Sequence, residues 1–414
     1  MGEITHRVVT RRLDDEVDLM AFSAEDGLLV ERDGVGLAGR GLAAEIHITD
    51  SDPAAVAAAF AAAATAFEVD DDVGLPGCGL VAFGALPFDP DRPRVLRVPE
   101  VLVGRASDGT RWLTQVICTD GDDPGPVDLA PSPPLESAVD PGEIRVRSSR
   151  PPAEWCAALA EGRDALRTTE ELHKFVLARE VLVESDRPIS RSAVLRRLRN
   201  AYPGCYLTSV GSMVGASPEL LLSRVGDIVR SRPMAGTAPR SSDPTADARL
   251  AASLLASNKD RDEHQVTIDM VRDTLLPWCS YLDAEPEPSI VAMANVQHLA
   301  TYVEGRLSTP PASALELVTA LHPTPAVCGS PTDAALALIA RLEGFDRGPY
   351  AGPVGWVDHR GNGEWAVGIR SAEVHGTTAR VFAGVGVMAD SDPDAELAET
   401  RAKLQAMLSA LLRP

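Results

Sequence analysis

Two ionisable residues stand beside sequence features that could hold them in place for acid and base chemistry. Lys174 precedes the apolar run Phe175–Leu177, and Glu219 follows Pro218 and precedes a second apolar run. A lysine buried among apolar neighbours loses affinity for its proton and can act as a base near neutral pH. Taken alone, a strand lysine is more often an edge residue, and such a glutamate more often faces water. The rest of the chain has to decide between these interpretations.

Two further glutamates could bind a metal ion. Glu263 lies near the start of a predicted helix, and Glu399 lies within 382–404, FAGVGVMADSDPDAELAETRAKL. There, Glu396, Glu399 and Lys403 are spaced by three and four residues, and on a helix they would most simply form a solvated stripe. Two glutamates that converge could instead bind Mg²⁺, which prefers oxygen ligands and uses one or two carboxylates with an anionic substrate. Spacing alone does not show that the two meet.

The elements that must position these residues alternate between strands and helices, which indicates an α+β protein with large sheets. Strands are predicted within 173–185, 206–212, 217–233, 295–307, 352–357, 364–374 and 379–388. Helices are predicted within 54–69, 151–170, 245–257, 259–278, 313–321 and 333–343. In the helix at 259–278, the apolar face is expected to comprise Val266, Met270, Val271 and Leu275. A final helix should begin after Asp392, with Pro393 at its first position.

The composition of the chain excludes several classes of function. Its 414 residues carry 39 Lys and Arg against 60 Asp and Glu, a formal charge of −21, so a nucleic-acid partner is not expected. No run is long and apolar enough to span a membrane, and the N-terminus lacks the apolar core of a signal peptide. The six cysteines form no CxxC pair or Cys/His cluster, which argues against zinc and a disulfide framework. A cytoplasmic protein without a membrane anchor is expected.

Eight ordered stretches between residues 150 and 412 resemble the chorismate-utilising enzymes, which include anthranilate, aminodeoxychorismate, salicylate and isochorismate synthases. The stretches are KFVLARE, SPELLLSR, RPMAGTAPR, KDRDEHQV, VQHLATYVEG, LHPTPAVCGSP, GEWAVGIRSAEV and AGVGVMADSDPDAELAETRAKL. A weaker segment, GALPFDPDRP, lies at 84–93. The resemblance implies the fold of anthranilate synthase component I, with large antiparallel sheets flanked by helices. It also implies a divergent N-terminal half at 1–125, a Pro- and Asp-rich connection at 126–150 and a chorismate-binding catalytic region at 151–414.

Within this family the chain is most similar to isochorismate synthases of the siderophore and menaquinone type. The loop LHPTPAVCG has their His-Pro-Thr-Pro-Ala form, whereas anthranilate and aminodeoxychorismate synthases tend to have Pro-Ala-Gly-Thr there. Ala235 stands where aminodeoxychorismate synthases often have a nucleophilic lysine. The chain contains no glutamine amidotransferase domain, and no amidotransferase subunit is expected. These features favour water as the nucleophile. A monomer or weak homodimer is expected.

The resemblance assigns roles to individual residues. Lys174 aligns with the general base and Glu219 with the general acid, while Glu263 and Glu399 align with the ligands of Mg²⁺. Because the base must be neutral and the acid protonated, the site has to shift both pKa values toward neutrality.

The remaining matched positions are expected to bind substrate. Arg370 and Lys403 align with residues that bind substrate carboxylates, for which the planar guanidinium of arginine is well suited. The supporting positions implied by the resemblance are Gly236, Thr237, His298 and Gly386. The role of Glu396 stays open.

The implied reaction is the conversion of chorismate to isochorismate by addition of water at C2 and loss of the C4 hydroxyl. A salicylate synthase, which goes on to eliminate pyruvate, is the nearest alternative, because no motif separates the two. A chorismate-binding protein without turnover is the alternative from another class. The presence of the base, the acid and both expected metal ligands argues against it.

Overall fold

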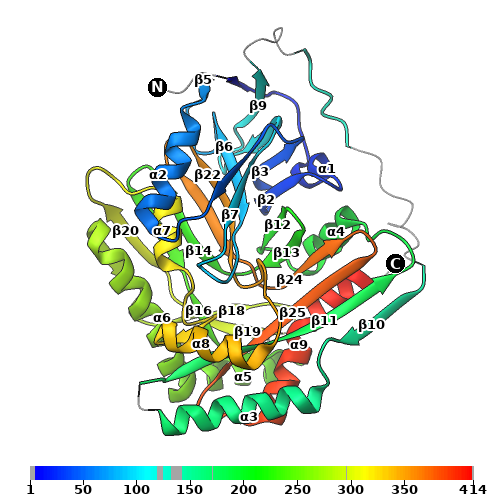
Figure 1. Ribbon diagram of the computed structural model, residues 1–414, viewed down its shortest axis with the longest axis vertical. Coiled ribbons are helices and arrows are strands. Elements are labelled where there is room, and N and C mark those ends of the chain that lie inside the picture. The colour runs from blue at the N-terminus through cyan, green and yellow to red at the C-terminus, as the bar shows by residue number, and fades with distance from the viewer. Residues whose placement is uncertain (1–4, 119–124, 132–141, 170, 295, 413–414) are drawn as a thin grey trace.

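Two large β-sheets face each other across a core of apolar side chains (Figure 1). The computed structural model describes residues 5–118, 125–131, 142–169, 171–294 and 296–412. Leu37 and Trp112 of the first sheet pack against Phe83, Val354 and Trp356 of the second. Burial of aromatic and aliphatic surface from both sheets therefore holds the sandwich together.

The first sheet has 13 strands, and its paired strands are antiparallel except for one parallel pair, β1 with β5. Its strands in spatial order are β10 (Ile144–Ser148), β11 (Lys174–Ser185), β25 (Thr378–Val387), β24 (Ser371–His375), β13 (Met213–Ser217), β12 (Tyr206–Val210), β2 (Leu28–Arg32), β3 (Val35–Arg40), β8 (Val101–Arg105), β9 (Arg111–Cys118), β1 (His6–Arg12) and β5 (Phe67–Asp71), with β21 (Gly329–Ser330) also paired to β11. The antiparallel sheets expected from the resemblance are confirmed.

The second sheet has nine strands and a third sheet has three. The second comprises, in order, β17 (Cys279–Ala284), β20 (Val303–Leu307), β15 (Ile228–Arg232), β14 (Leu220–Val225), β23 (Gly363–Val367), β22 (Pro353–Asp358), β6 (Val81–Ala85), β7 (Arg94–Val98) and β4 (Ala44–Ile48). The third comprises β16 (Met234–Pro239), β19 (Val296–Ala300) and β18 (Ser289–Ala292).

Helices cover the outside of the sheets. They are α1 (Leu19–Ser23), α2 (Pro53–Ala64), α3 (Pro152–Thr168), α4 (Arg191–Ala201), α5 (Pro244–Ala256), α6 (Asn258–Leu275), α7 (Ala314–Leu321), α8 (Thr332–Glu343) and α9 (Pro393–Leu412), with a 3₁₀ turn at Leu276–Trp278. Helix α8 packs on β11 and α9 packs on β25 (Figure 1). No helix within the described ranges is long and apolar enough to cross a membrane.

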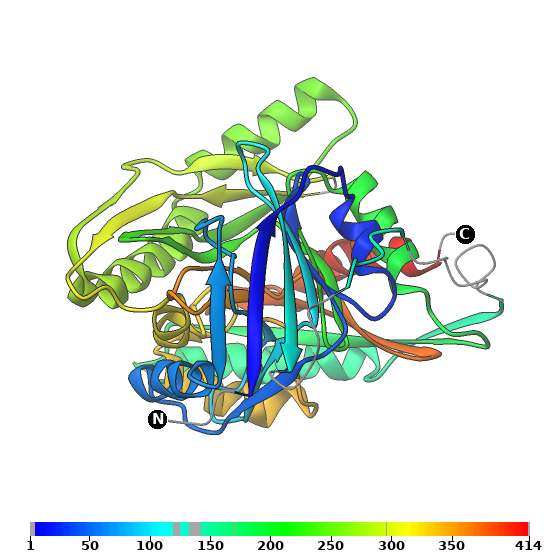
Figure 2. The same cartoon turned by 90° about the horizontal axis from the view of Figure 1, so that it is seen from above.

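N-terminal strands pair with strands from much later in the chain in both large sheets. Strand β2 pairs with β12, and β6 pairs with β22. Viewed from above, the blue and cyan N-terminal strands run through the middle of the molecule, among segments that come later in the chain (Figure 2). Within the predicted connection at 126–150, residues 132–141 lie outside the described part of the chain.

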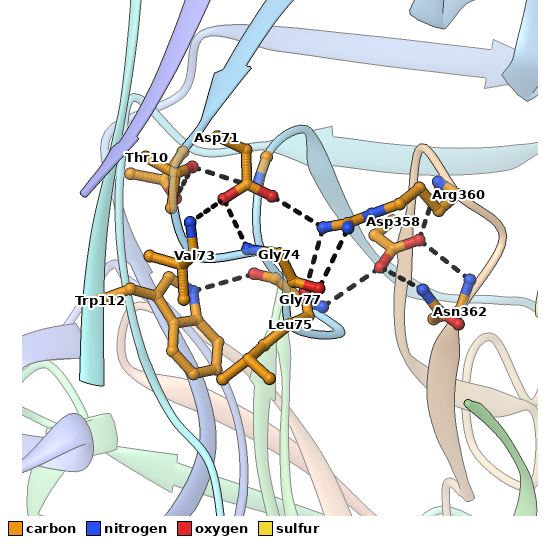
Figure 3. Close-up of polar contacts among 12 residues, drawn as sticks. Thr10, Asp71, Val73, Gly74, Leu75, Gly77, Trp112, Asp358, Arg360 and Asn362 are labelled. Atoms are coloured by element: carbon orange, nitrogen blue, oxygen red, sulfur yellow. Dashed lines mark hydrogen bonds and ion pairs between the residues drawn. The ribbon is translucent and has the colours of Figure 1, made fainter. Parts of the chain in front are cut away.

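A polar network, buried at Asp358 and exposed at Arg360, ties the N-terminal strands to the turn between β22 and β23 (Figure 3). Arg360 forms an ion pair with Asp71 at 2.8 Å and donates a hydrogen bond to the Gly74 carbonyl. Asp358 accepts a hydrogen bond from the backbone N–H of Gly77 at 3.2 Å. These contacts join positions almost 290 residues apart, so the two ends of the chain stabilise each other.

Two expectations about the elements need correction. The segment 364–374 is not one strand, because β23 belongs to the second sheet and β24 to the first. Val266 is 38% exposed, so it is not part of the buried face of α6, which instead includes His264 and Ile268. The prediction considered apolar residues alone, whereas the buried face of α6 also contains the polar residues His264 and Thr267. The start of α9 is confirmed: Asp392 accepts hydrogen bonds from the N–H groups of the first turn.

Candidate active site

One cavity of about 120 Å³ lies where both large sheets, the small sheet, α6 and α9 converge. Nine of the ten predicted site residues line it: Glu219, Gly236, Thr237, Glu263, His298, Arg370, Gly386, Glu399 and Lys403. The tenth, Lys174, is buried directly behind Glu263. Residues that span more than half of the chain are therefore brought together as the resemblance implied.

Two crossings of the chain between the large sheets deliver Glu219 and Arg370. Glu219 lies between β13 of the first sheet and β14 of the second, and Arg370 lies between β23 and β24. Arg370 has a φ of 52°, a left-handed conformation that costs a residue with a side chain of the order of 1 kcal/mol. Its buried contacts must hold it there.

Lys174 and Glu263 form a buried ion pair across two elements. The Nζ of Lys174, at the start of β11, donates to Oε1 of Glu263 on α6 at 2.7 Å. Burial alone would raise the pKa of Glu263, but the adjacent Lys174 charge outweighs it and the net shift is downward. Gly386, opposite Val176 in the sheet, leaves the room for this pair: a Cβ there would approach Glu263 Oε1 to 2.8 Å and Lys174 Cε to 2.9 Å.

Lys403 and Glu399 form a second ion pair, within helix α9. The Nζ of Lys403 lies 2.7 Å from Glu399 Oε1 and donates a hydrogen bond to the Gly384 carbonyl at 2.9 Å. The four-residue spacing seen in the sequence thus places both side chains on one helix face. That face lines the cavity and is not a solvated stripe.

Glu219 is held in a form suited to proton donation. It is 3% exposed, and burial raises its pKa to about 7, against the lowering effects of the Met234 N–H and of the Lys174, Arg370 and Lys403 charges. A carboxyl group with this pKa is protonated in a large fraction of molecules at neutral pH. The upward shift expected for the acid is what the site produces.

Arg370 is oriented by a chain of hydrogen bonds through His298. Burial, together with the Arg370 and Lys403 charges, lowers the pKa of His298 to about 3, so its imidazole is neutral. Its Nδ1 lies 3.2 Å from the Gly236 carbonyl, which can only accept, so Nδ1 carries the proton and Nε2 accepts from Arg370 Nη2 at 3.3 Å. Thr237 Oγ1 lies 3.1 Å from the same Nδ1.

The carboxylates around the cavity suit a divalent cation. Asp260, Glu263, Glu396 and Glu399 all line it. Burial, and to a smaller extent the Glu399 charge, raise the pKa of Glu396 to about 7. Among the described residues, no three His, Cys, Asp or Glu side chains are grouped as a complete metal site. Mg²⁺ needs only one or two carboxylates, with water and substrate completing its shell, so Glu263 and Glu399 fit it.

Several cavity residues were missed by the sequence reasoning. Asp260 and Lys259 line the cavity, as do Tyr350 and the loop residues Ala326 and Val327. Asp260 precedes Glu263 by three residues on one helix, a spacing that could have flagged it. Tyr350 carries no such signal, because it reaches the cavity only through the fold.

Comparison with known proteins places the chain in a family. A family model described as chorismate binding enzyme matches residues 27–412. The chain belongs to this family. A Mycobacterium tuberculosis relative that carries the name MenF is 42% identical over 350 residues, which cover 81% of this chain and 87% of that protein. Isochorismate synthase DhbC of Bacillus subtilis is 46% identical over 251 residues, 58% of this chain and 63% of that protein.

A solved structure supports the same fold for this family member. The menaquinone-specific isochorismate synthase MenF of Escherichia coli superposes with a TM-score of 0.81, covering 99% of this chain and 95% of that chain. At 23% identity this likeness shows the fold alone.

Proposed function

We propose that this chain is an isochorismate synthase that converts chorismate to isochorismate in the cavity described above. The relatives with this name and the family membership support the proposal. The observation that carries it is Glu219, a buried carboxyl with a pKa of about 7 in the same cavity as Arg370 and Lys403. A proton donor beside two cations matches a dianionic substrate that must lose a hydroxyl group.

The proposed reaction is an exchange of one water for another across the substrate ring. Lys174 accepts a proton from water as the water oxygen bonds to C2. The ring double bond shifts and the C4–O bond breaks. Glu219 gives its proton to the departing oxygen, which leaves as water. Arg370 and Lys403 hold the substrate carboxylates so that C2 and C4 face the base and the acid.

The Lys174–Glu263 pair constrains the role of the base. Lys174 can accept a proton only as a neutral amine, and its Nζ is held 2.7 Å from the Glu263 carboxylate. Lys174 can therefore act as the base only when the Glu263 carboxylate interacts with a group other than Lys174. Glu263 and Glu399 would hold Mg²⁺, which when bound supplies positive charge beside the substrate carboxylate.

Product analysis tests the proposal. Purified protein is mixed with chorismate and either Mg²⁺ or EDTA, and the products are followed by NMR. A Mg²⁺-dependent approach to a stable mixture of chorismate and isochorismate, without pyruvate, is expected. Salicylate with an equal amount of pyruvate would make the protein a lyase, and unchanged chorismate would leave only binding.

A matched pair of variants separates the acid from other buried carboxyls. Glu219→Gln should lose turnover by about 10²- to 10⁴-fold. Glu31→Gln is the control, because Glu31 is also buried with a pKa raised by burial to about 7, yet lies outside this cavity. Equal losses in both variants would remove Glu219 from the mechanism.

The metal assignment is tested by titration. Glu263→Gln and Glu399→Gln should each require more Mg²⁺ for half-maximal turnover, since each removes one carboxylate ligand. Activation curves that match wild type would contradict the assignment.

A further inference from the structure

A buried arginine outside the cavity holds two of the cavity walls. Arg347 follows α8 and is 3% exposed, and it forms an ion pair with Glu343, the last residue of that helix. Burial alone would lower the pKa of Arg347, but the Glu343 charge outweighs it and the net shift is upward. The guanidinium is therefore a fixed charge that keeps all its donors.

The guanidinium donates to backbone carbonyls on two separate segments. Nη1 donates to the Val327 carbonyl and Nη2 to the Val176 carbonyl, each at 2.9 Å. Both valines line the cavity, Val176 from β11 and Val327 from the loop before β21. One side chain thus bridges the strand that begins with Lys174 and the opposite loop.

Glu343, the carboxylate partner of Arg347, also contacts β11. Glu343 accepts a hydrogen bond from the Ala178 N–H at 2.6 Å, while the Val176 N–H donates to the Cys328 carbonyl at 2.6 Å. Strand β11 is therefore held at Val176 and at Ala178, both close to Lys174. The backbone carbonyl of Arg347 also accepts from the N–H of Tyr350, a third wall of the cavity.

A purely structural role has to be weighed against this arrangement. The guanidinium also stacks on the Phe88 ring, 4.0 Å from its centroid. Loss of that packing would reduce stability without touching the chemistry. The two roles differ in what a lysine would do, because an ammonium can keep the charge pair with Glu343 but lacks the planar fork that spans two carbonyls.

We propose that Arg347 is a positioning residue, which sets the start of β11 and hence Lys174 relative to the Ala326–Val327 wall. This inference rests on the proposed function, because it assumes that Lys174 takes part in turnover. A displacement of about 1 Å at a reacting group can lower the rate by about 100-fold.

The test is Arg347→Lys, compared with Arg224→Lys as a matched control. Arg224 is also buried and also donates to two backbone carbonyls, those of Gly226 and Arg360, but neither of these two residues lines the cavity. In Arg347→Lys, kcat should fall by about 10- to 100-fold with KM changed less than about threefold. Arg224→Lys should keep the wild-type kcat even where its melting temperature falls equally.

Hydrogen exchange supplies a readout that does not need turnover. Amides of β11 around Val176 and Ala178 should exchange faster in Arg347→Lys and at the wild-type rate in Arg224→Lys. Glu343→Gln should give an intermediate increase, because its amide oxygen can still accept from Ala178. Unchanged exchange, or faster exchange with a wild-type kcat, would overturn the positioning role. An inactive wild type would overturn the proposed function instead, so the two failures are distinguishable.

Discussion

Two lysine–glutamate pairs at the cavity wall have the same 2.7 Å separation but arise in different ways. Lys403 and Glu399 are four residues apart on α9, and both retain access to solvent. Lys174 and Glu263 are 89 residues apart and join β11 to α6, and their side chains are 3% and 17% exposed, against 12% and 31% for Lys403 and Glu399. An exposed pair of this spacing is worth about 0.3–0.5 kcal/mol, whereas removing one partner of a buried pair costs about 3–5 kcal/mol. The same 2.7 Å distance is therefore expected to contribute differently to stability in the two pairs.

The largest difference between the pairs should appear in turnover. Lys174→Ala is expected to lower kcat by about 10²- to 10⁴-fold, because it removes the proposed base. Steady-state kinetics with chorismate and Mg²⁺ measure this. If Lys174→Ala retained a near-normal rate, the Lys174–Glu263 pair would have only a structural role. The two pairs would then not differ in catalysis.

Stability should separate the carboxylates next. Without Mg²⁺, Glu263→Gln removes the carboxylate partner of the buried Lys174 side chain and should lower the free energy of unfolding by about 3 kcal/mol. Glu399→Gln should lower it by at most about 0.5 kcal/mol. Urea unfolding with EDTA gives both values. Similar losses would mean that solvent reaches the two pairs equally.

A smaller effect is expected for Lys403→Met. This lysine should contact a substrate carboxylate, so KM is expected to rise about tenfold while kcat changes less, the pattern of lost ground-state binding. Arg401→Met is a suitable control, because Arg401 is exposed on the same helix and lies outside the cavity lining. A fall in kcat with KM unchanged would instead place Lys403 in the chemical step.

The smallest effect concerns pH. The pKa of Glu219 is about 7, raised by burial from 4.5. Protonated Glu219 is the acid, so kcat/KM should fall as pH rises through about 7. Stability should fall over the same direction, from about pH 4.5 to pH 7, because the folded state binds the extra proton. The Lys403 charge lowers this pKa, so Lys403→Met should move the fall of kcat/KM to higher pH. If kcat/KM fell at the same pH in Lys403→Met as in wild type, Lys403 would not influence the pKa of Glu219.

The two pairs also show what the sequence could predict. The spacing of Glu399 and Lys403 placed them on one helix face, and Asp392 placed the start of α9, because these signals are local. The contact of Lys174 with Glu263 did not follow from spacing, since it depends on how β11 and α6 meet. Only matched motifs indicated that such distant segments share a site.

Other features escaped because they arise from the packing of sheets. The run at 364–374 resembled one strand, yet Arg370 turns between the two sheets with a positive φ. The room that Gly386 leaves for the buried pair is likewise visible only once β25 lies beside β11. Alternation of apolar residues reports that a segment is extended, but it does not report which sheet the segment joins.

The pairing of β11 with β25 bears on how the protein is made. Strand β11 begins at Lys174, but its partner β25 lies at 378–387. A ribosome must therefore translate about nine-tenths of the message before β11 gains β25 as its neighbour, and α9 follows later still. Chains that end before β25 lack five lining residues of the cavity: Gly384, Gly386, Glu396, Glu399 and Lys403. Premature termination should therefore yield fragments that neither consume the substrate nor compete for it.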